Sequence, residues 1–210
     1  GINFKDITTL LIEPELSSAI IDCFIERLKG KKVDAIVGVE SRGFLFGFLL
    51  ANKIGIPFVP IRKVGKLPGE TLKYKYDLEY GSAEVEIHKS DIKKGWNIVI
   101  HDDLLATGGT ACAAAELIQA LGAKVAAFAF VISLDFLNGN EKLEKYSKEI
   151  ISLKRYWMDF TINENQKMIA DMVQQFGRQN ITPFVREWDD KQIFPLDVFK
   201  KLGELGLMGV

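Results

Sequence analysis

Apolar and polar residues follow two different periods along the first 135 residues of the chain. Pro14 to Lys29 carries apolar residues at helical spacing, with Pro at its start and Gly30 after its end. Phe44 to Ile54 and Ala111 to Leu121 are further stretches of helical length. Short apolar runs that predict strands are Val33 to Val39, Pro57 to Ile61, Ile98 to Ile100 and Val125 to Ile132. This alternation predicts an α/β domain whose mostly parallel sheet is flanked by helices.

The pattern changes between the second and third predicted strands. Arg62 to Tyr80 is polar and basic and lacks a helical period. Loops of this length inside a compact domain are often functional lids, so we expect a mobile lid here. Ala83 to His88 alternates in polarity, which predicts a solvent-facing strand of a hairpin.

The pattern changes again near Tyr156. From Met158 onward the spacing predicts two amphipathic helices. Thr161 and Glu164 have the spacing of a capping box at the start of the first helix, and the second begins near Pro195. We therefore expect an α-helical C-terminal tail.

Composition narrows the class of protein. Of 210 residues, 48% are hydrophobic and 26% are charged, and the net charge is -1, so we expect neither disorder nor sequence-independent nucleic-acid binding. We expect no membrane contact, because no uncharged apolar run reaches the length of a membrane-spanning helix. Cys23 and Cys112 lie in apolar helical patterns, which predicts buried free thiols and a cytoplasmic location.

One segment combines several features of a sugar-phosphate site. The strand at Val99 and Ile100 leads into Asp102 and Asp103, and a turn of small residues and a helix follow. Residues at the carboxyl end of a parallel strand face the crevice where α/β sheets bind ligands. Glycines let backbone N–H groups approach a phosphate, and a helix N-terminus favours an anion. We expect phosphate at the turn and ribose hydroxyls over the carboxylates.

This segment, Asp-Asp-Leu-Leu-Ala-Thr-Gly-Gly-Thr at residues 102–110, resembles the phosphoribosyl pyrophosphate (PRPP) motif of type I phosphoribosyltransferases, in its adenine phosphoribosyltransferase form. Six other segments resemble further parts of that family in the same order. They are Phe4 to Thr8, Glu40 to Gly47, the lid segments Arg62 to Gly69 and Leu78 to Gly81, and Leu137 to Leu143 with Ser152 to Tyr156. The resemblance implies a type I phosphoribosyltransferase fold over residues 1–156 and the conversion of adenine and PRPP to AMP and pyrophosphate.

The resemblance also implies roles for individual residues. Glu79 would be the catalytic carboxylate, which donates a proton to the adenine ring from a closed site. Tyr80 would belong to the lid that covers the site. The residues expected to bind PRPP are Asp102, Asp103, Ala106, Thr107, Gly108, Gly109, Thr110, Arg42, Arg62, Lys63 and Lys66.

Asn3, Lys5 and Leu134 would line the base pocket. Two of them depart from the family pattern, because a hydrophobic residue is frequent at the position of Asn3 and an arginine at that of Lys5. Lysine cannot reproduce the planar fork of arginine. The chain begins with Gly1 within a segment that reads as structured, so we expect the N-terminus to be truncated.

The resemblance implies Mg²⁺ as the cofactor, bridging pyrophosphate and ribose oxygens. Mg²⁺ keeps several waters and uses substrate oxygens, so we expect no dedicated cage of metal ligands in the sequence. The expected partners are adenine, PRPP and a second copy of the chain in a homodimer.

Residues 158–210 resemble a different family. Met158 to Gln166, Phe194 and Pro195, and Phe199 to Gly209 are similar to the N-terminal helices of acyl-CoA dehydrogenases. Because only those helices are present, we expect no catalysis from the tail. Only Trp157 separates Met158, which has the character of a start residue, from Tyr156 at the end of the first resemblance. We therefore interpret the chain as two joined reading frames with Trp157 at the junction.

Two alternatives stay open at this point. The departures at Asn3 and Lys5 allow a phosphoribosyltransferase for another base. A non-catalytic, PRPP-binding regulator is the second alternative, although such a regulator would need no glutamate in the lid, where Glu79 is present.

Overall fold

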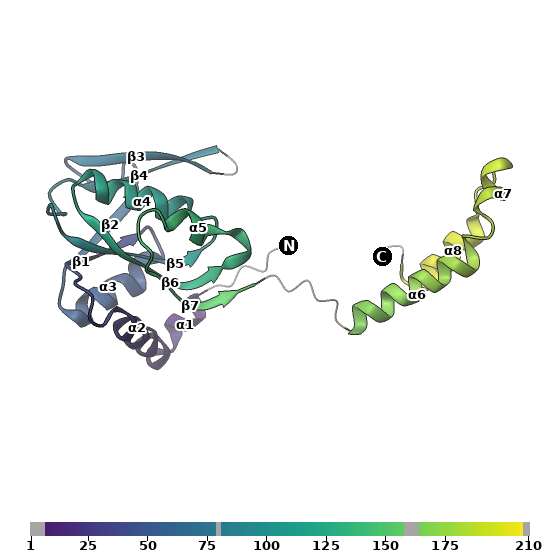
Figure 1. The fold of residues 1–210 in the computed structure, drawn as a ribbon, viewed down its shortest axis with the longest axis horizontal. Helices are drawn as coiled ribbons and strands as arrows, with labels where there is room; N and C mark the ends of the chain where they lie inside the picture. The colour runs from purple at the N-terminus through teal and green to yellow at the C-terminus, as the bar shows by residue number, and fades with distance from the viewer. Residues whose placement is uncertain (1–6, 79–80, 158–163, 208–210) are drawn as a thin grey trace. The chain divides into compact units, whose positions relative to one another are not determined.

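The computed structural model describes residues 7–78, 81–157 and 164–207. The chain divides into two compact units, residues 1–158 and residues 159–210. Each unit is considered by itself (Figure 1).

The first unit is built on a seven-stranded sheet with the strand order β3-β4-β2-β1-β5-β6-β7. Strands β2, β1, β5, β6 and β7 are parallel, and β4 runs antiparallel to both β2 and β3. The strands are β1 (Ala35–Val39), β2 (Phe58–Lys63), β3 (Thr71–Leu78), β4 (Gly81–His88), β5 (Asn97–Leu105), β6 (Lys124–Leu134) and β7 (Ile150–Tyr156).

Helices cover both faces of this sheet, as Figure 1 shows. They are α1 (Thr8–Ile12), α2 (Pro14–Leu28), α3 (Gly43–Ile54), α4 (Gly109–Ala120), the 3₁₀ turn η1 (Asp135–Leu137) and α5 (Gly139–Leu143). Side chains of α2 and α3 pack with Ile36 and Val99 on one face, while α4 packs with Val37 and Ile100 on the other. Successive residues of β1 therefore face different layers, and all five of them are buried.

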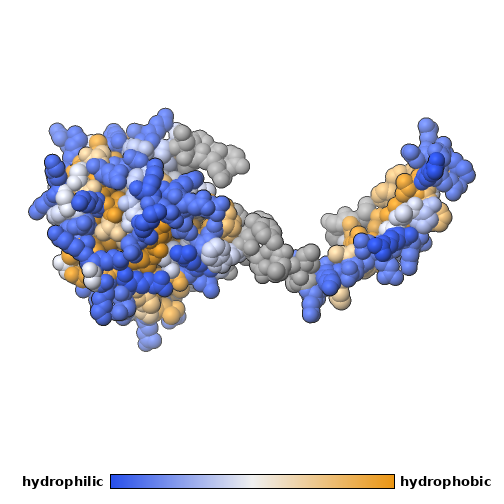
Figure 2. Space-filling view, in the orientation of Figure 1, coloured by the Kyte–Doolittle hydropathy of each residue, from blue (hydrophilic) through white to orange (hydrophobic). Residues whose placement is uncertain are grey.

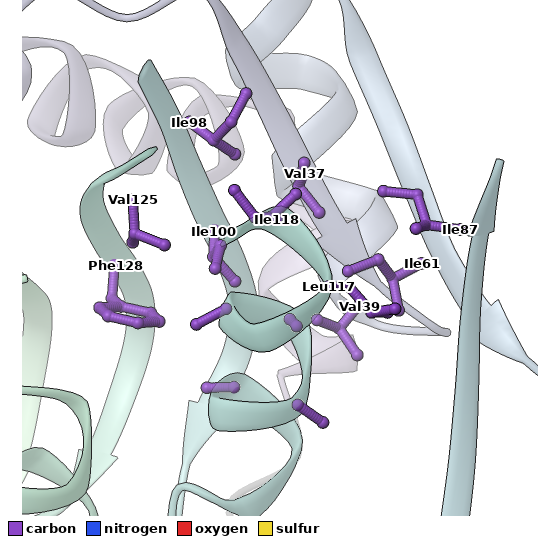
Figure 3. Packing of buried hydrophobic residues seen from close by; sticks show 14 of the residues in the cluster. Val37, Val39, Ile61, Ile87, Ile98, Ile100, Leu117, Ile118, Val125 and Phe128 are labelled. Atoms are coloured by element: carbon purple, nitrogen blue, oxygen red, sulfur yellow. The ribbon is translucent and has the colours of Figure 1, made fainter. Parts of the chain in front are cut away.

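The core around α4 combines branched aliphatic side chains with alanines and two phenylalanines. Leu117 and Ile118 of α4 lie over side chains from strands β1, β2, β5 and β6, including Val37, Ile61 and Ile100 (Figure 3). Phe128 lies at the β6 side of the same cluster. Burial of this kind contributes about 1.5–3 kcal/mol for each large side chain. The core thereby fixes β1 and β5, whose ends carry the candidate site.

The structure confirms the predicted class: a mostly parallel sheet flanked by helices, followed by C-terminal helices. The three predicted helices of the first unit are present within two residues of their expected bounds. Strand β5 is longer than predicted, because it continues through Asp102 and Asp103 to Leu105. The carboxylates therefore belong to the strand and do not follow it.

Three local predictions were wrong. The segment Arg62 to Tyr80 is not wholly a loop, since Thr71–Leu78 forms β3 and pairs with β4. The predicted hairpin strand is present as β4, but it does not face solvent at Glu86, which is only 2% exposed although it lies between the buried Val85 and Ile87. Cys23 is exposed, since it lies outside the buried face of α2.

The second unit holds three helices in its described part, where two were predicted. They are α6 (Glu164–Asn180), α7 (Val185–Asp190) and α8 (Leu196–Glu204). No residue of these three helices is buried, and Figure 2 shows apolar side chains at the surface of this unit. Thr161, the predicted cap residue, lies outside the described residues.

In the described parts of both units, no helix is long and apolar enough to cross a membrane.

Candidate active site

The candidate site lies where the strand order reverses. Strand β1 has β2, the next strand in the chain, on one side and β5 on the other. The connections that leave β1 and β5 lead to helices α3 and α4, which cover opposite faces of the sheet. A crevice outside the carboxyl ends of the strands forms at such a point, and ligands of α/β proteins bind there.

The turn after β5 has the geometry of a phosphate loop. Gly108 has a φ of 80°, a left-handed conformation that favours glycine, and it caps the N-terminus of α4. The free N–H groups of the first helical turn and the helix dipole favour an anion at this position. The turn lines a cavity of about 80 Å³, which includes all five predicted loop residues, Ala106, Thr107, Gly108, Gly109 and Thr110, together with Asp102.

The phosphate loop is backed by the turn that starts α5. A Cβ atom added to Gly139 would lie 2.2 Å from the carbonyl oxygen of Ala106, and one added to Gly108 would lie 2.9 Å from the carbonyl oxygen of Gly139. Only glycine at both positions permits this approach. The shape of the phosphate loop therefore depends on a segment about thirty residues further along the chain.

The two adjacent carboxylates differ in their surroundings. Asp103 is buried, and its Oδ2 lies 3.0 Å from Nε of Arg42. Asp102 accepts the backbone N–H of Asp103 through its own Oδ1 at 2.9 Å. Burial and the neighbouring charge of Asp103 raise the pKa of Asp102 well above its usual range, and Arg42 offsets only part of that rise. The surroundings of Asp102 therefore favour its protonated form more than those of an exposed aspartate would.

Arg42 is brought to the carboxylates by the close approach of α3 to β5. A Cβ atom added to Gly43 would lie 2.8 Å from the carbonyl oxygen of His101 and 3.1 Å from Oδ1 of Asp102. His101 is buried on the same strand and packs edge-on against Phe24, with ring centroids 5.3 Å apart. Burial lowers the pKa of His101 to about 4, so it is neutral at physiological pH. His101 therefore packs as a neutral side chain.

The remaining predicted cations lie at the end of β2. Nη2 of Arg62 lies 2.9 Å from Oε1 of Glu40, and Nη1 of Arg62 donates to the carbonyl oxygen of Lys66 at 3.1 Å. Oε2 of Glu40 accepts the backbone N–H of Lys63 at 2.8 Å. The hydrogen bond from Arg62 lowers the pKa of Glu40, so this carboxylate is ionised at neutral pH. Arg62 is therefore held in place by Glu40, while the Lys63 and Lys66 side chains are exposed.

A larger cavity of about 360 Å³ lies between the end of β2 and the phosphate loop. Glu40, Lys63 and Thr110 line it, together with residues of β3 and β4. Tyr76 of β3 reaches across to Thr110, and their hydroxyl oxygens are 3.2 Å apart. The hairpin β3–β4 thus contacts the phosphate loop directly. Lys63 and the N-terminus of α4 both line this cavity, and both would attract a negatively charged diphosphate.

Of the three residues predicted to line the base pocket, the structure describes only Leu134. Leu134 ends β6, is half-buried, and is paired with Tyr156 of β7. It is not among the residues that line either of the two cavities. The other residues predicted for base binding, catalysis and the lid, Asn3, Lys5, Glu79 and Tyr80, lie outside the described residues.

Three residues near the site had no predicted role. Glu40 binds Arg62, Tyr76 contacts Thr110, and Glu86 is buried below the segment that carries Lys66. The charge of Glu40 beside Ser41 and Arg42 was visible in the sequence, but its partner was not. The period of β4 indicated an exposed Glu86, so no local signal identified it.

The side chains at the site can be compared with those that a bound Mg²⁺ ion would need. Among the residues that the structure describes, no group of three or more His, Cys, Asp or Glu could hold a metal ion. Asp103 is already paired with Arg42. The residues present fit a Mg²⁺ ion that is carried chiefly by substrate oxygens and water, with Asp102 and Asp103 nearby.

Comparison with known proteins gives two matches to family models. Residues 6–168 match the phosphoribosyl transferase domain, and residues 163–210 match the N-terminal domain of acyl-CoA dehydrogenase. The two matches overlap over residues 163–168, whereas the compact units of the structure separate after residue 158.

Individual relatives agree with the first match. An adenine phosphoribosyltransferase from Clostridium tetani is 54% identical over 156 residues, which cover 74% of this chain and 90% of that protein. The crystal structure of the enzyme from Thermoanaerobacter pseudethanolicus is similar, with a TM-score of 0.72, 49% identity, and coverage of 74% of this chain and 90% of that one. The Saccharomyces cerevisiae enzyme, solved in complex with an imino-altritol bisphosphate and adenine, has a TM-score of 0.68, 46% identity, and coverage of 73% and 88%. The chain therefore belongs to the phosphoribosyltransferase family, in its adenine phosphoribosyltransferase branch.

Proposed function

We propose that this chain transfers the phosphoribosyl group of PRPP to adenine, which forms AMP and releases pyrophosphate in purine salvage. The observation that carries the proposal lies where the strand order reverses: the loop at Gly108 and Asp102 line one cavity, and Asp103, the next residue, is paired with Arg42. A phosphate-binding turn alone would fit many nucleotide-binding proteins. The added cations and carboxylates match a substrate with phosphate at one end, ribose hydroxyls in the middle and a diphosphate at the other.

The chain's own residues suit the charge that develops in this reaction. When the bond to the sugar carbon breaks, positive charge forms on the sugar and negative charge on the leaving pyrophosphate. Arg42 can donate to pyrophosphate with its planar guanidinium, and Lys63 and Lys66 add positive charge. Bound Mg²⁺ would supply further neutralisation of the pyrophosphate oxygens. The turn at Gly108 would hold the 5′-phosphate, which orients the sugar for attack by the base.

The carboxylates would position the ribose. Asp103, oriented by Arg42, can accept a hydrogen bond from a ribose hydroxyl. Asp102, with its raised pKa, can donate one to a ribose or pyrophosphate oxygen. Glu79 remains the proposed proton donor to adenine, and Tyr80 the proposed cover of the site. Leu134, Asn3 and Lys5 remain the proposed contacts of the base.

The assembly and location remain predictions. We infer a homodimer from the family resemblance, and a cytoplasmic location from the cysteine content of the sequence. Sedimentation velocity at micromolar chain concentration tests the first of these.

A panel of nucleobases tests the proposed reaction. The purified chain is mixed with PRPP, Mg²⁺ and adenine, hypoxanthine, guanine, xanthine or orotate in turn, and nucleotide and pyrophosphate are quantified. We expect AMP from adenine and no comparable product from the other bases. A different preferred base would correct the specificity, and PRPP binding without any product would indicate a regulator.

A further inference from the structure

Glu86 is a buried carboxylate beside the site to which the proposed mechanism gives no role. It lies on β4, between β2 and β3, and only 2% of the residue is exposed. Its neighbours Val85 and Ile87 belong to the core around α4. Glu86 therefore faces the opposite side of the sheet. A carboxylate buried this far is costly unless its oxygens accept hydrogen bonds.

The hydrogen bonds of Glu86 come from one segment, residues 63–70, which we name the lysine loop, and from the residue that follows it. Oε1 of Glu86 accepts the backbone N–H groups of Lys66 and Leu67, both at 3.0 Å. Oε2 accepts the hydroxyl of Thr71 at 3.0 Å. Burial alone would raise the pKa of Glu86, but the hydrogen bonds from Leu67, Thr71 and Lys66 outweigh it and hold the pKa below its usual value. The lysine loop is thus folded around an ionised carboxylate.

The loop is also fixed from the side of the candidate site. Both backbone polar groups of Lys66 are hydrogen-bonded. Its N–H donates to Glu86, and its carbonyl oxygen accepts from Arg62 at 3.1 Å. Arg62 is in turn paired with Glu40, which also accepts the N–H of Lys63. Gly65 has a φ of +85°, the left-handed conformation that this turn requires. Glu86 and Glu40 therefore determine together where the loop lies.

We propose that Glu86 is a positioning residue for the pyrophosphate end of PRPP, acting through the lysine loop. Its carboxylate holds the backbone of Lys66 and Leu67 and thereby fixes the loop whose Lys63 lines the cavity of about 360 Å³. The cations Arg62 and Lys66 belong to the same hydrogen-bonded segment. The inference rests on the proposed function, because it assigns pyrophosphate to that cavity. Glu86 itself does not need to touch substrate.

Replacement of Glu86 by glutamine tests this role. In Glu86→Gln one oxygen becomes an NH₂ group, which must face either the N–H donors of the loop or the hydroxyl of Thr71. We expect PRPP binding, measured by calorimetry with Mg²⁺, to weaken about tenfold, because hydrogen bonds to a charged acceptor are lost. The KM for PRPP should rise in parallel, while the kcat and the KM for adenine stay within about twofold.

Glu70→Gln is the matched control. The Glu70 side chain belongs to the same loop and is 90% exposed, so its replacement should leave PRPP binding unchanged. Thr71→Val removes only the third hydrogen bond and should weaken PRPP binding by a smaller factor, which Thr71→Ser should restore. This pair decides the question if Glu86→Gln does not fold.

Several results would overturn the inference. One is a folded Glu86→Gln chain that binds PRPP as the parent does. Another is an equal loss of affinity for PRPP and adenine in proportion to unfolded protein, which would indicate a purely structural role. A parent that binds PRPP but forms no AMP would refute the proposed function and leave the inference on Glu86 standing. A parent that does not bind PRPP would refute both.

Discussion

Two arginine side chains of the candidate site, where the strand order reverses, are held by ion pairs in the absence of substrate. Nε of Arg42 lies 3.0 Å from Oδ2 of Asp103, and Nη2 of Arg62 lies 2.9 Å from Oε1 of Glu40. Pairs of this kind orient a long flexible side chain and reduce the entropy that is lost when a ligand binds. We infer that the cations of the site are preorganised by carboxylates from the same strand ends.

Arg42→Lys tests the value of the planar guanidinium. Lysine keeps the charge but can neither pair with Asp103 through Nε nor bind pyrophosphate with two parallel hydrogen bonds. We expect kcat/KM for PRPP to fall by about 10–100-fold. Arg27→Lys, on the exposed surface of α2, is the control and should change nothing. Equal activity of the Arg42 and Arg27 variants would exclude Arg42 from the site.

Glu40 gives the site a predictable pH dependence. Its pKa is lowered below 4.5, the ordinary value, chiefly by the hydrogen bond from Arg62. A carboxyl group with a lowered pKa in the folded state adds stability above the ordinary value, and this stability is lost as the pH falls through the lowered one. Urea unfolding should therefore show that the parent loses more stability than Glu40→Gln as the pH falls from neutral to values below 4.5. Parallel curves for the two proteins would contradict the ion pair.

At the scale of elements, the site depends on close contacts between segments that are distant in sequence. Helix α3 approaches β5 at Gly43, and the start of α5 approaches the phosphate loop at Gly139. Backbone-to-backbone contacts of this kind leave no room for a methyl group. Element packing, and not only side-chain chemistry, therefore shapes the anion-binding turn.

Gly139→Ala is the direct test of that packing. The new methyl group would meet the carbonyl oxygen of Ala106 at 2.2 Å, so the phosphate loop or α5 must move. We expect a loss of about 1–3 kcal/mol in stability, together with weaker PRPP binding. Gly177→Ala is the control, because nothing lies within 4 Å of its added Cβ in α6. The packing account fails if Gly139→Ala binds PRPP as tightly as the parent.

The sequence predicted those elements whose burial is regular. Buried strands such as β1 and helices with one apolar face such as α2 repeat at their own period, so their positions could be read directly. Strand β3 was missed because its polar residues pair with β4 at the edge of the sheet. Glu86 was assigned to solvent because the covering loop is brought there by tertiary contacts. The phosphate loop was found, but the pairing of Arg62 with Glu40 could not be, since 22 residues separate them.

At the scale of the whole molecule, two units with matches to different families share one chain. Every described residue of the candidate site lies in the first unit, and the helices of the second contribute no buried residue. The boundary that we propose, with one domain at residues 1–156 and a helical fragment at 158–210, remains to be tested. The tail is proposed to be non-catalytic.

Removal of residues 159–210 tests this division of labour. We expect kcat and both KM values to stay within about twofold of the full chain, because every described residue of the candidate site lies outside the removed part. Steady-state kinetics of the two proteins at equal concentration gives the comparison. A large loss of activity without unfolding of the first unit would show that the helices belong to the site.

The central claim is tested most directly by the products of one reaction. The full 210-residue chain is incubated with adenine, PRPP and Mg²⁺, and AMP and pyrophosphate are quantified over time by chromatography. We expect both products to form in equal amounts, and Asp103→Asn, which breaks the pair with Arg42, to slow their formation. If the folded chain binds PRPP yet forms neither product with adenine, the assignment of adenine phosphoribosyltransferase activity is wrong.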